Sequence, residues 1–218
     1  MRQELLEYAK IPSGFVIPPI EEILRDINEL QALKGDGHYQ LSTGRHSRRF
    51  LRSWVLVQKV TLIERISNLL AQSFWHDEIN AVLSSSVMPC PIIAYGVARA
   101  FCTSGKSVRL VLPINEHNRL KIGSSDEILP GERVMIIHDI AVRGGVINQL
   151  EDLITGSRAH IAGVGMVFDV SGGEVQFPKD VKTVAIIKEG FGKEDSVNCT
   201  MCREGIPLEN PYDELHPS

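Results

Sequence analysis

An ionisable pair, His138 and Asp139, follows directly after the apolar run VMII, and a glycine pair, Gly144 and Gly145, comes a few residues later. The run predicts a buried strand, and the sequence GVINQLEDLI predicts a helix after the turn. Glycines at a helix start leave backbone N–H groups free to bind an anion such as a phosphate. Asp139 would accept hydrogen bonds from ribose hydroxyls, and His138 is a candidate general base. The structural alternative is that Asp139 caps the turn, the glycines allow tight packing and His138 is a satisfied histidine at a strand end.

Arg143 and a run of serines are the other polar groups expected near this turn. Arg143 has three interpretations: it binds a phosphate from within the loop, it fills an empty donor site, or it pairs with Asp139 and closes the pocket. The loop SSSVMPCP follows the apolar run AVL and begins with three serines. Their hydroxyls could donate to the same anion, whereas the alternative is a rigid structural turn. These serines are Ser84, Ser85 and Ser86.

Cys199 and Cys202 have the CxxC spacing of half a metal site or of a redox pair. No second CxxC and no nearby histidine pair completes a zinc site within one chain in the sequence, so we expect no metal and favour a buried tail motif. Two chains supplying four thiolates are the alternative. In a reducing compartment the four cysteines are expected to be thiols or metal ligands and not disulfides.

Alternating apolar runs and helices must position these residues. Apolar strands separated by helices imply an α/β fold with a mostly parallel central sheet covered on both faces. Ligands of such a sheet bind beyond the carboxyl ends of the strands. Helices are predicted at 20–33, 61–76, 92–105 and 145–157, and strands at 38–41, 54–57, 79–85, 107–114, 132–140, 160–170 and 181–190.

The composition is that of a globular protein that can bury a core. The 218 residues are 43% hydrophobic and 23% charged, which suits one large domain or a domain with a small annex. A net charge of −4 gives no general attraction to nucleic acid or anionic membranes. No apolar run is long enough to cross a bilayer, and the charged N-terminus lacks the apolar stretch of a secretory signal. We therefore expect a cytoplasmic protein without a membrane partner.

Several segments, in the same order, resemble type I phosphoribosyltransferases, and most closely the orotate phosphoribosyltransferases. HDIAVRGGV resembles the motif that binds the diphosphoribosyl donor, which has two acidic residues, two variable positions and then Thr-Thr-Gly-Gly-Ser. The resemblance covers about residues 20–211. The other matching segments are GHYQLSTGRHSRRFLRSWVLVQ (37–58), IIAYGVARAF (92–101), LKIGSSDEILPGERVMIIHD (120–139), GVGMVFDVSGG (163–173) and CTMCREGIPL (199–208).

The resemblance implies the type I phosphoribosyltransferase fold with a small hood made from both ends of the chain. It divides the chain into an N-terminal arm, a helix and hood segment, a phosphoribosyltransferase-like core and a C-terminal tail with the CxxC. These parts are expected at 1–19, 20–60, 61–190 and 191–218.

The departures from the family pattern fall on the residues that hold the donor. His138 replaces the first acidic residue of the motif, and Pro89-Cys90 replaces a Gly-Gly pair whose backbone contacts pyrophosphate. Proline has no N–H, so that loop loses a donor. Val170 replaces an arginine that helps to hold orotate, and valine cannot pair with a carboxylate. The hydroxyls for the 5′-phosphate are also lost, because Val142, Arg143 and Val146 replace two threonines and a serine.

Two further segments of the resemblance carry candidate binding residues. The flexible loop retains some positive charge, although an ordinary solvated loop explains it equally well; its candidates are His117, Arg119 and Lys121. The N-terminal substrate segment is centred on a turn; its candidates are Ser42, Thr43, Gly44, Arg45 and Ser47.

Three functions remain open from the sequence. The first is a relative of orotate phosphoribosyltransferase that binds a nucleotide or ribose phosphate as a regulator or effector subunit, without ordinary transfer. The second is an active enzyme with an altered substrate, performing pentosyl transfer or N-glycosidic cleavage of a nucleotide. The third, an ordinary enzyme of pyrimidine metabolism, is disfavoured by the departures at the donor site.

The cofactor and the partners follow from the same choice. The cofactor is unknown, and Mg²⁺ is expected only if transfer from the diphosphoribosyl donor is retained. The resemblance implies a homodimer, and the arm at 1–19 offers a site for a protein partner.

Overall fold

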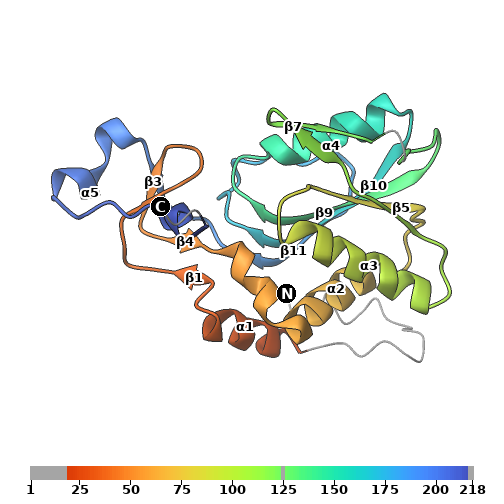
Figure 1. Cartoon of the computed structure of the whole chain (residues 1–218), viewed down its shortest axis with the longest axis horizontal. Coiled ribbons are helices and arrows are strands. Elements are labelled where there is room, and N and C mark those ends of the chain that lie inside the picture. Colours follow the sequence, from red (N-terminus) through yellow and green to blue (C-terminus); the bar gives the residue numbers. More distant parts are fainter. Residues whose placement is uncertain (1–18, 124–125, 216–218) are drawn as a thin grey trace.

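The computed structural model describes residues 19–123 and 126–215. The predicted N-terminal arm, and with it the expected site for a protein partner, lies outside the described residues except for Pro19. A sheet with helices on both faces occupies one end of the molecule, and a smaller hood occupies the other (Figure 1).

The central sheet has five strands in the order β11-β10-β9-β5-β6. Every neighbouring pair is parallel, which confirms the predicted α/β class and the mostly parallel sheet. The central strands are buried almost throughout, as expected when both faces are covered. The strands are β5 (Ala81–Ser84), β6 (Arg109–Val111), β9 (Arg133–Ala141), β10 (His160–Asp169) and β11 (Thr183–Lys188).

Helices pack on each face of the sheet and form two apolar cores. α2 (Val60–Ser73) and α3 (Cys90–Thr103) cover one face, where the larger core also includes residues of α1 (Ile20–Glu29). α4 (Gly145–Gly156) covers the opposite face over the second core (Figure 1). The apolar residues whose helical spacing predicted these helices therefore lie on the side of each helix that faces the sheet.

The first helix is shorter than predicted. α1 ends at Glu29, whereas the periodicity extended to residue 33. Gln31 takes a positive φ of 49°, which turns the chain, and the N–H of Ala32 bonds to the carbonyl of Ile27. Leu33 then starts the short strand β1 (Leu33–Lys34), which pairs with β4 (Phe50–Leu51).

The predicted strand at 54–57 is wrong, because the structure forms the 3-10 helix η1 (Ser53–Gln58) there. Val55 and Leu56 are buried in the larger core, and the chain continues through Lys59 into α2. A short apolar run does not distinguish a strand from a buried helical turn, which explains the error.

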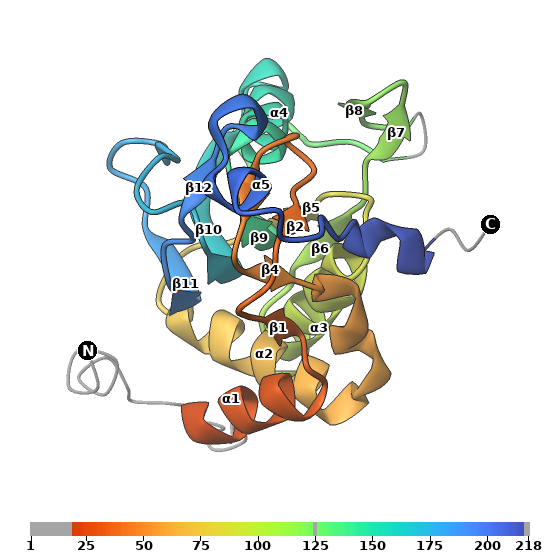
Figure 2. The ribbon, with the colours of Figure 1, turned by 90° about the vertical axis from the view of Figure 1, so that its left-hand side faces the viewer.

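The hood joins segments that lie far apart in the sequence. Its sheet has the order β12-β3-β2, with both pairs antiparallel. The tail then adds α5, two 3-10 helices and a bridge between Glu209 and Tyr39 (Figure 2). The hood elements are β2 (Tyr39–Gln40), β3 (His46–Ser47), β12 (Lys193–Glu194), η2 (Ser196–Asn198), α5 (Thr200–Arg203) and η3 (Pro211–Leu215).

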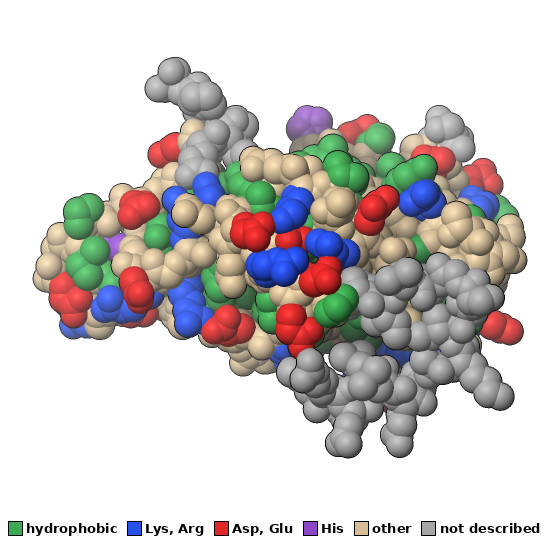
Figure 3. Space-filling view, turned by 90° about the horizontal axis from the view of Figure 1, so that it is seen from below, with side chains coloured by type: hydrophobic (Ala, Val, Ile, Leu, Met, Phe, Trp, Pro, Cys, Tyr) green, Lys and Arg blue, Asp and Glu red, His purple; other side chains and the backbone are tan. Residues whose placement is uncertain are grey.

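Acidic and basic side chains are interleaved on the face that is seen from below (Figure 3). Ion pairs join Arg65 to Glu22 at 2.8 Å and Lys59 to Asp26 at 2.7 Å. In the uncovered part of this face, charges of both signs alternate, which leaves no extended region of one sign for a polyanion (Figure 3). Among the described helices, none combines the length and apolar character that crossing a bilayer requires.

Candidate functional site

The carboxyl ends of β5 and β9 lie side by side and bring two predicted site loops together. The strands are parallel, and Ser84 pairs with Ile137 at the end of their ladder. His138 and Asp139 follow on β9, next to the serine loop that leaves β5. This is the edge at which parallel sheets hold ligands.

A buried cluster of three side chains links these loops. Sγ of Cys90, the first residue of α3, lies 3.2 Å from Oδ1 of Asp139 and 3.4 Å from Nδ1 of His138. The same His138 nitrogen is 3.4 Å from Oδ1 of Asp139, and all three residues are buried. The Cys90 thiol donates to the carboxylate, so sulfur covers one side of the predicted ribose-binding group. Sequence reasoning did not include Cys90 among the site residues. Its position after Pro89, at the start of a helix next to the serine loop, was the pattern that could have identified it.

Burial sets the protonation of this cluster. It raises the pKa of the Cys90 thiol well above its ordinary value, and the Asp139 carboxylate adds to the effect by repelling a thiolate. Burial also lowers the pKa of His138, with a smaller opposing effect from Asp139. Near neutral pH the cluster therefore contains a neutral thiol and a neutral imidazole. A neutral imidazole can accept a proton, so the predicted role of His138 as a general base stays a prediction.

The three serines lie at different depths. Ser84 is buried, and its hydroxyl donates to the carbonyl of Ser85 at 3.0 Å. Ser85 is also buried, and its hydroxyl lies close enough to the sulfur of Cys90 to favour the thiolate, but it has no hydrogen bond of normal geometry. Ser86 is half-buried. Ser85 is therefore the serine whose hydroxyl is left for a ligand.

The turn before α4 keeps the geometry of an anion site. Gly144 has φ 79° and ψ −3°, the left-handed conformation that favours glycine. A Cβ at Gly144 would also lie 3.1 Å from a methyl carbon of Val175. Gly145 begins the helix, whose first-turn N–H groups have no partner within the helix. The glycine pair therefore has the backbone conformation that an anion site requires, and its role in binding a phosphate stays a prediction.

The side chains around this turn are less suited to a phosphate than its backbone is. Val142 is half-buried and Val146 is partly exposed, and neither side chain offers a donor. Arg143 is exposed, while the close partners of Asp139 are Cys90 and His138. The interpretation in which Arg143 pairs with Asp139 and closes the pocket is therefore wrong, and the two phosphate-related interpretations stay predictions.

The same edge does not suit Mg²⁺. This ion binds carboxylate oxygens, phosphates and water in octahedral geometry. The turn supplies one carboxylate, Asp139, and that group accepts a hydrogen bond from a thiol. Its neighbour is the imidazole of His138, where the family pattern has a second acid. The residues at this edge therefore do not fit a bound Mg²⁺ ion.

The predicted flexible loop contains a hairpin. β7 (Ile114–Glu116) pairs with β8 (Arg119–Lys121) in antiparallel register, and His117 and Asn118 form its turn with positive φ. Nζ of Lys121 pairs with Glu116 at 2.6 Å, whereas His117 and Arg119 are exposed. The backbone N–H of Leu120 donates to the side-chain carbonyl of Gln149 on α4, so the hairpin is attached to this helix.

The predicted substrate segment lies in the hood turn between β2 and β3. Ser42 and Gly44 are exposed, Thr43 is half-buried and Ser47 is buried. The half-buried Arg45 pairs with Glu174 at 3.4 Å. This pair connects the hood to the loop that follows β10.

Lys193 on β12 is a cation that sequence reasoning missed. Its side chain is 2% exposed. Nζ donates to the carbonyls of Val142 at 3.3 Å and Ser171 at 3.1 Å, and to Glu174 at 3.0 Å. It therefore joins the hood both to the turn before α4 and to the turn that contains the buried Val170. No local pattern marks this residue, because its partners come together only in the folded chain.

The buried His138 predicts a specific acid sensitivity. Its pKa in the folded state is below the ordinary value of 6.5, so the unfolded chain binds a proton that the folded chain does not. The contribution of His138 to the free energy of unfolding does not change with pH above 6.5. It becomes destabilising as the pH falls below that value toward the pKa of the folded state. Over that interval we expect His138→Asn to reduce the slope of the free energy of unfolding against pH by up to about 1.4 kcal/mol per pH unit.

Urea unfolding at a series of pH values measures this slope. The exposed His160 provides the matched control, since His160→Asn should leave the slope unchanged. Equal slopes for the wild type and His138→Asn would show that His138 titrates alike in both states.

Comparison with known proteins gives the same fold and indicates a family. A scan against protein-family models finds no match. The structure of Mycobacterium tuberculosis orotate phosphoribosyltransferase superposes with a TM-score of 0.61 at 14% identity, covering 78% of this chain and 96% of that one. Adenine phosphoribosyltransferase from Thermoanaerobacter pseudethanolicus gives a TM-score of 0.58 at 13% identity, covering 76% and 99%. These likenesses confirm the predicted phosphoribosyltransferase fold.

Relatives found by sequence have a higher sequence identity to this chain than these two structures have. The orotate phosphoribosyltransferase of Caldanaerobacter subterraneus subsp. tengcongensis is 30% identical over 191 residues, which are 88% of this chain and 96% of the relative. That of Thermoanaerobacter sp. strain X514 is 30% identical over 192 residues, with the same coverage of both chains. With this identity over nearly the whole length of its relatives, the chain belongs to the orotate phosphoribosyltransferase family.

Proposed function

We propose that the protein binds ribose 5-phosphate, free or as part of a nucleotide, at the carboxyl edge of the sheet, and that it acts as a regulator or subunit without ordinary transfer from the diphosphoribosyl donor. The observation that carries the proposal is the position of Cys90. Its thiol contacts the side chains of Asp139 and His138, between the loop that would hold pyrophosphate and the turn that would hold the sugar phosphate.

The loss of backbone donors at the pyrophosphate loop supports the absence of transfer. Pro89 has no N–H to offer. The N–H of Cys90 donates to the carbonyl of Val87 at 3.0 Å, so it is occupied within the turn. Neither residue at the position of the family's glycine pair therefore presents a free amide to an anion.

The turn before α4 supports binding of the sugar phosphate. The positive φ of Gly144 and the free N–H groups of the first turn form an anion site that needs no side chain. Ser85 contributes a buried hydroxyl without a protein partner. One monophosphate matches this set of donors better than a sugar that carries both a phosphate and a pyrophosphate.

A second candidate is an active enzyme with an altered acceptor, performing pentosyl transfer or N-glycosidic cleavage. Lys193 favours it, because its Nζ lies 3.1 Å from the carbonyl of Ser171, beside the position where Val170 replaces an orotate-binding arginine. The names of the two sequence relatives also favour retained transfer chemistry.

An activity assay tests whether ordinary transfer from the diphosphoribosyl donor to orotate is absent. Purified protein is incubated with orotate, the diphosphoribosyl donor and Mg²⁺, and released pyrophosphate is measured beside the Caldanaerobacter relative as positive control. We expect no pyrophosphate above background. Turnover that Asp139→Asn abolishes would contradict the proposal, because it would show that the retained carboxylate still supports transfer.

A thermal-shift titration tests the binding half of the proposal. Ribose 5-phosphate should raise the Tm of the wild type, since a ligand that binds only the folded state stabilises it. Asp139→Asn should weaken the shift by removing a ribose acceptor, whereas Asp152→Asn, on the exposed side of α4, should not. Equal shifts in all three proteins would place the ligand elsewhere.

We also propose that the protein is a homodimer, as the family resemblance implies. A groove of about 330 Å³ between α2 and α3 is lined by partly exposed apolar side chains, including Val60, Ile92 and Tyr95. A second copy of the chain would cover this surface. Light scattering should give twice the chain mass of 24.2 kDa, and a monomer at micromolar concentration would refute the proposal.

A further inference from the structure

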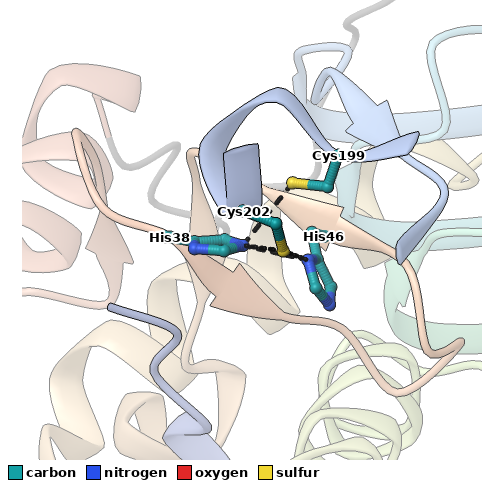
Figure 4. Close-up of side chains that lie close together, drawn as sticks. All are labelled: His38, His46, Cys199 and Cys202. Atoms are coloured by element: carbon teal, nitrogen blue, oxygen red, sulfur yellow. Dashed lines mark hydrogen bonds between the residues drawn. The ribbon is translucent and has the colours of Figure 1, made fainter. Parts of the chain in front are cut away.

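Four side chains with metal-binding atoms meet in the hood, away from the edge of the sheet. His38 precedes β2, His46 lies on β3, Cys199 is the N-cap of α5 and Cys202 lies within α5 (Figure 4). Their ligand atoms all lie within 4.8 Å of one another. The structure differs here from the sequence analysis, which found no histidine pair near the CxxC.

The distances within this cluster match the edges of a tetrahedron. Zinc binds sulfur at about 2.3 Å and imidazole nitrogen at about 2.0–2.1 Å, which places neighbouring nitrogen and sulfur ligands about 3.6 Å apart. Nε2 of His38 lies 3.6 Å from Sγ of Cys199 and 3.7 Å from Sγ of Cys202. Nδ1 of His46 lies 3.4 Å from Sγ of Cys202.

The two nitrogens are closer than in a metal site. They are 2.9 Å apart, whereas tetrahedral ligands at zinc–nitrogen distances would be about 3.4 Å apart. A small rotation of either imidazole opens this gap. Without a metal, the same spacing is a hydrogen bond between His46 and His38.

A second hydrogen bond prepares His38 as a ligand. Its Nδ1 lies 2.8 Å from the carbonyl of Ile206, which can only accept, so Nδ1 carries the proton. Nε2 then presents its lone pair to the centre of the cluster. A backbone carbonyl that fixes the tautomer of a ligating histidine is a recurrent feature of zinc sites.

We infer that His38, His46, Cys199 and Cys202 hold one structural zinc ion within a single chain. Two thiolates and two imidazoles are the donor set that zinc prefers in closed structural sites. Three of the four residues are buried, and the exposed Cys202 leaves a path for entry. Binding releases the protons of both thiols to solvent. The inference does not rest on the proposed function.

The size of the hood core gives the metal a role. Among the described residues, the apolar cluster of the hood comprises the buried side chains of Tyr39, Leu41 and Phe50, with Trp54 and Tyr212 packed against it, and Met201 of α5 is buried outside this cluster. Each such burial contributes roughly 1.5–3 kcal/mol, whereas ordering each residue of the hood costs about 1.5 kcal/mol. A segment with so few buried groups is typically held by a disulfide or a metal.

A disulfide between Cys199 and Cys202 is the competing explanation for the CxxC. It would leave the two histidines without a role in the cluster. It would also not account for the approach of both sulfurs to His38 Nε2, at 3.6 Å and 3.7 Å.

Metal analysis of the full-length chain tests the inference. Protein purified without chelator should contain about one zinc ion per chain by mass spectrometry. Cys199→Ser with Cys202→Ser should reduce the content to near zero, and His46→Asn should reduce it as well, which a site made of thiols alone would not show. Cys102→Ser is the matched control, because Cys102 lies near the C-terminal end of α3, where its thiol donates to the carbonyl of Val108.

Cobalt substitution provides a measurement that needs no variant. Replacement of the metal in the wild-type chain should give thiolate-to-cobalt charge-transfer bands and the intense visible bands of a tetrahedral complex. A wild-type chain without zinc and without such a spectrum would overturn the inference. So would zinc that persists in both His46→Asn and the double cysteine variant, or a disulfide between Cys199 and Cys202.

Discussion

Phe74→Ala is expected to lower the free energy of unfolding by about 3–5 kcal/mol, the range for removing a fully buried aromatic ring. Phe74 is 0% exposed at the end of α2, where its ring lies against β10. It contacts Gly163 so closely that a Cβ built on this glycine would be 2.2 Å from Cε1 of the ring. Urea unfolding followed by circular dichroism measures the loss.

The contact with Gly163 supplies the matched control. Gly163→Ala alone should destabilise by about 1–3 kcal/mol, because the new methyl group overlaps the ring. In the double variant the methyl group enters the cavity that Phe74→Ala leaves, so the double variant should be more stable than the sum of the two effects predicts. Additive effects would show that the ring and the glycine are not packed together as described.

The central sheet could be predicted because each of its strands has a local signal. Runs such as AVL before Ser84 and VMII before His138 are apolar on both sides, which is what a strand covered on both faces requires. The incorrect prediction of a strand at residues 54–57 (WVLV) has the same origin. Val55 and Leu56 are buried in either conformation, so their apolar character does not reveal the helical turn that the core selects.

Only those features of the candidate site that lie within a single loop could be predicted from the sequence. The anion geometry at Gly144 follows from two glycines at a helix start, a local pattern. The hydrogen bond between Cys90 and Asp139 joins residues 49 positions apart, and the bonds of Lys193 to Val142 and Ser171 join three separate elements. Such contacts depend on how strands and hood are arranged in space, so no spacing in the sequence records them.

The zinc cluster could be predicted in part, because its two halves are local patterns but their meeting is not. The CxxC was visible as half a site, and His38 and His46 are two histidines in one short hairpin. What could not be known is that the tail folds back onto this hairpin. The carbonyl of Ile206, which bonds His38, and the bridge between Glu209 and Tyr39 hold it there.

Loss of the metal is expected to unfold the hood while the central sheet stays folded. The two large cores contain the sheet and its helices, whereas the apolar cluster of the hood is small, with three buried side chains among the described residues. Structural zinc sites contribute an apparent binding free energy of about 10 kcal/mol or more, which greatly exceeds what those side chains provide. In Cys199→Ser with Cys202→Ser, the amides of β2, β3 and β12 should therefore lose protection against hydrogen exchange by about 100-fold or more, while those of β9 and β10 keep theirs.

The effect should also reach the candidate site, because β12 carries Lys193. When β12 unfolds, its bonds to the carbonyls of Val142 and Ser171 are lost, and the phosphate turn loses a support. The double variant should then show a smaller thermal shift with ribose 5-phosphate than Cys102→Ser, whose thiol lies on α3. Full protection of the hood amides in a metal-free double variant would contradict this account, since it would show that apolar contacts alone hold the hood. Unfolding of β9 and β10 together with the hood would contradict it differently, by showing that the two parts form one cooperative unit.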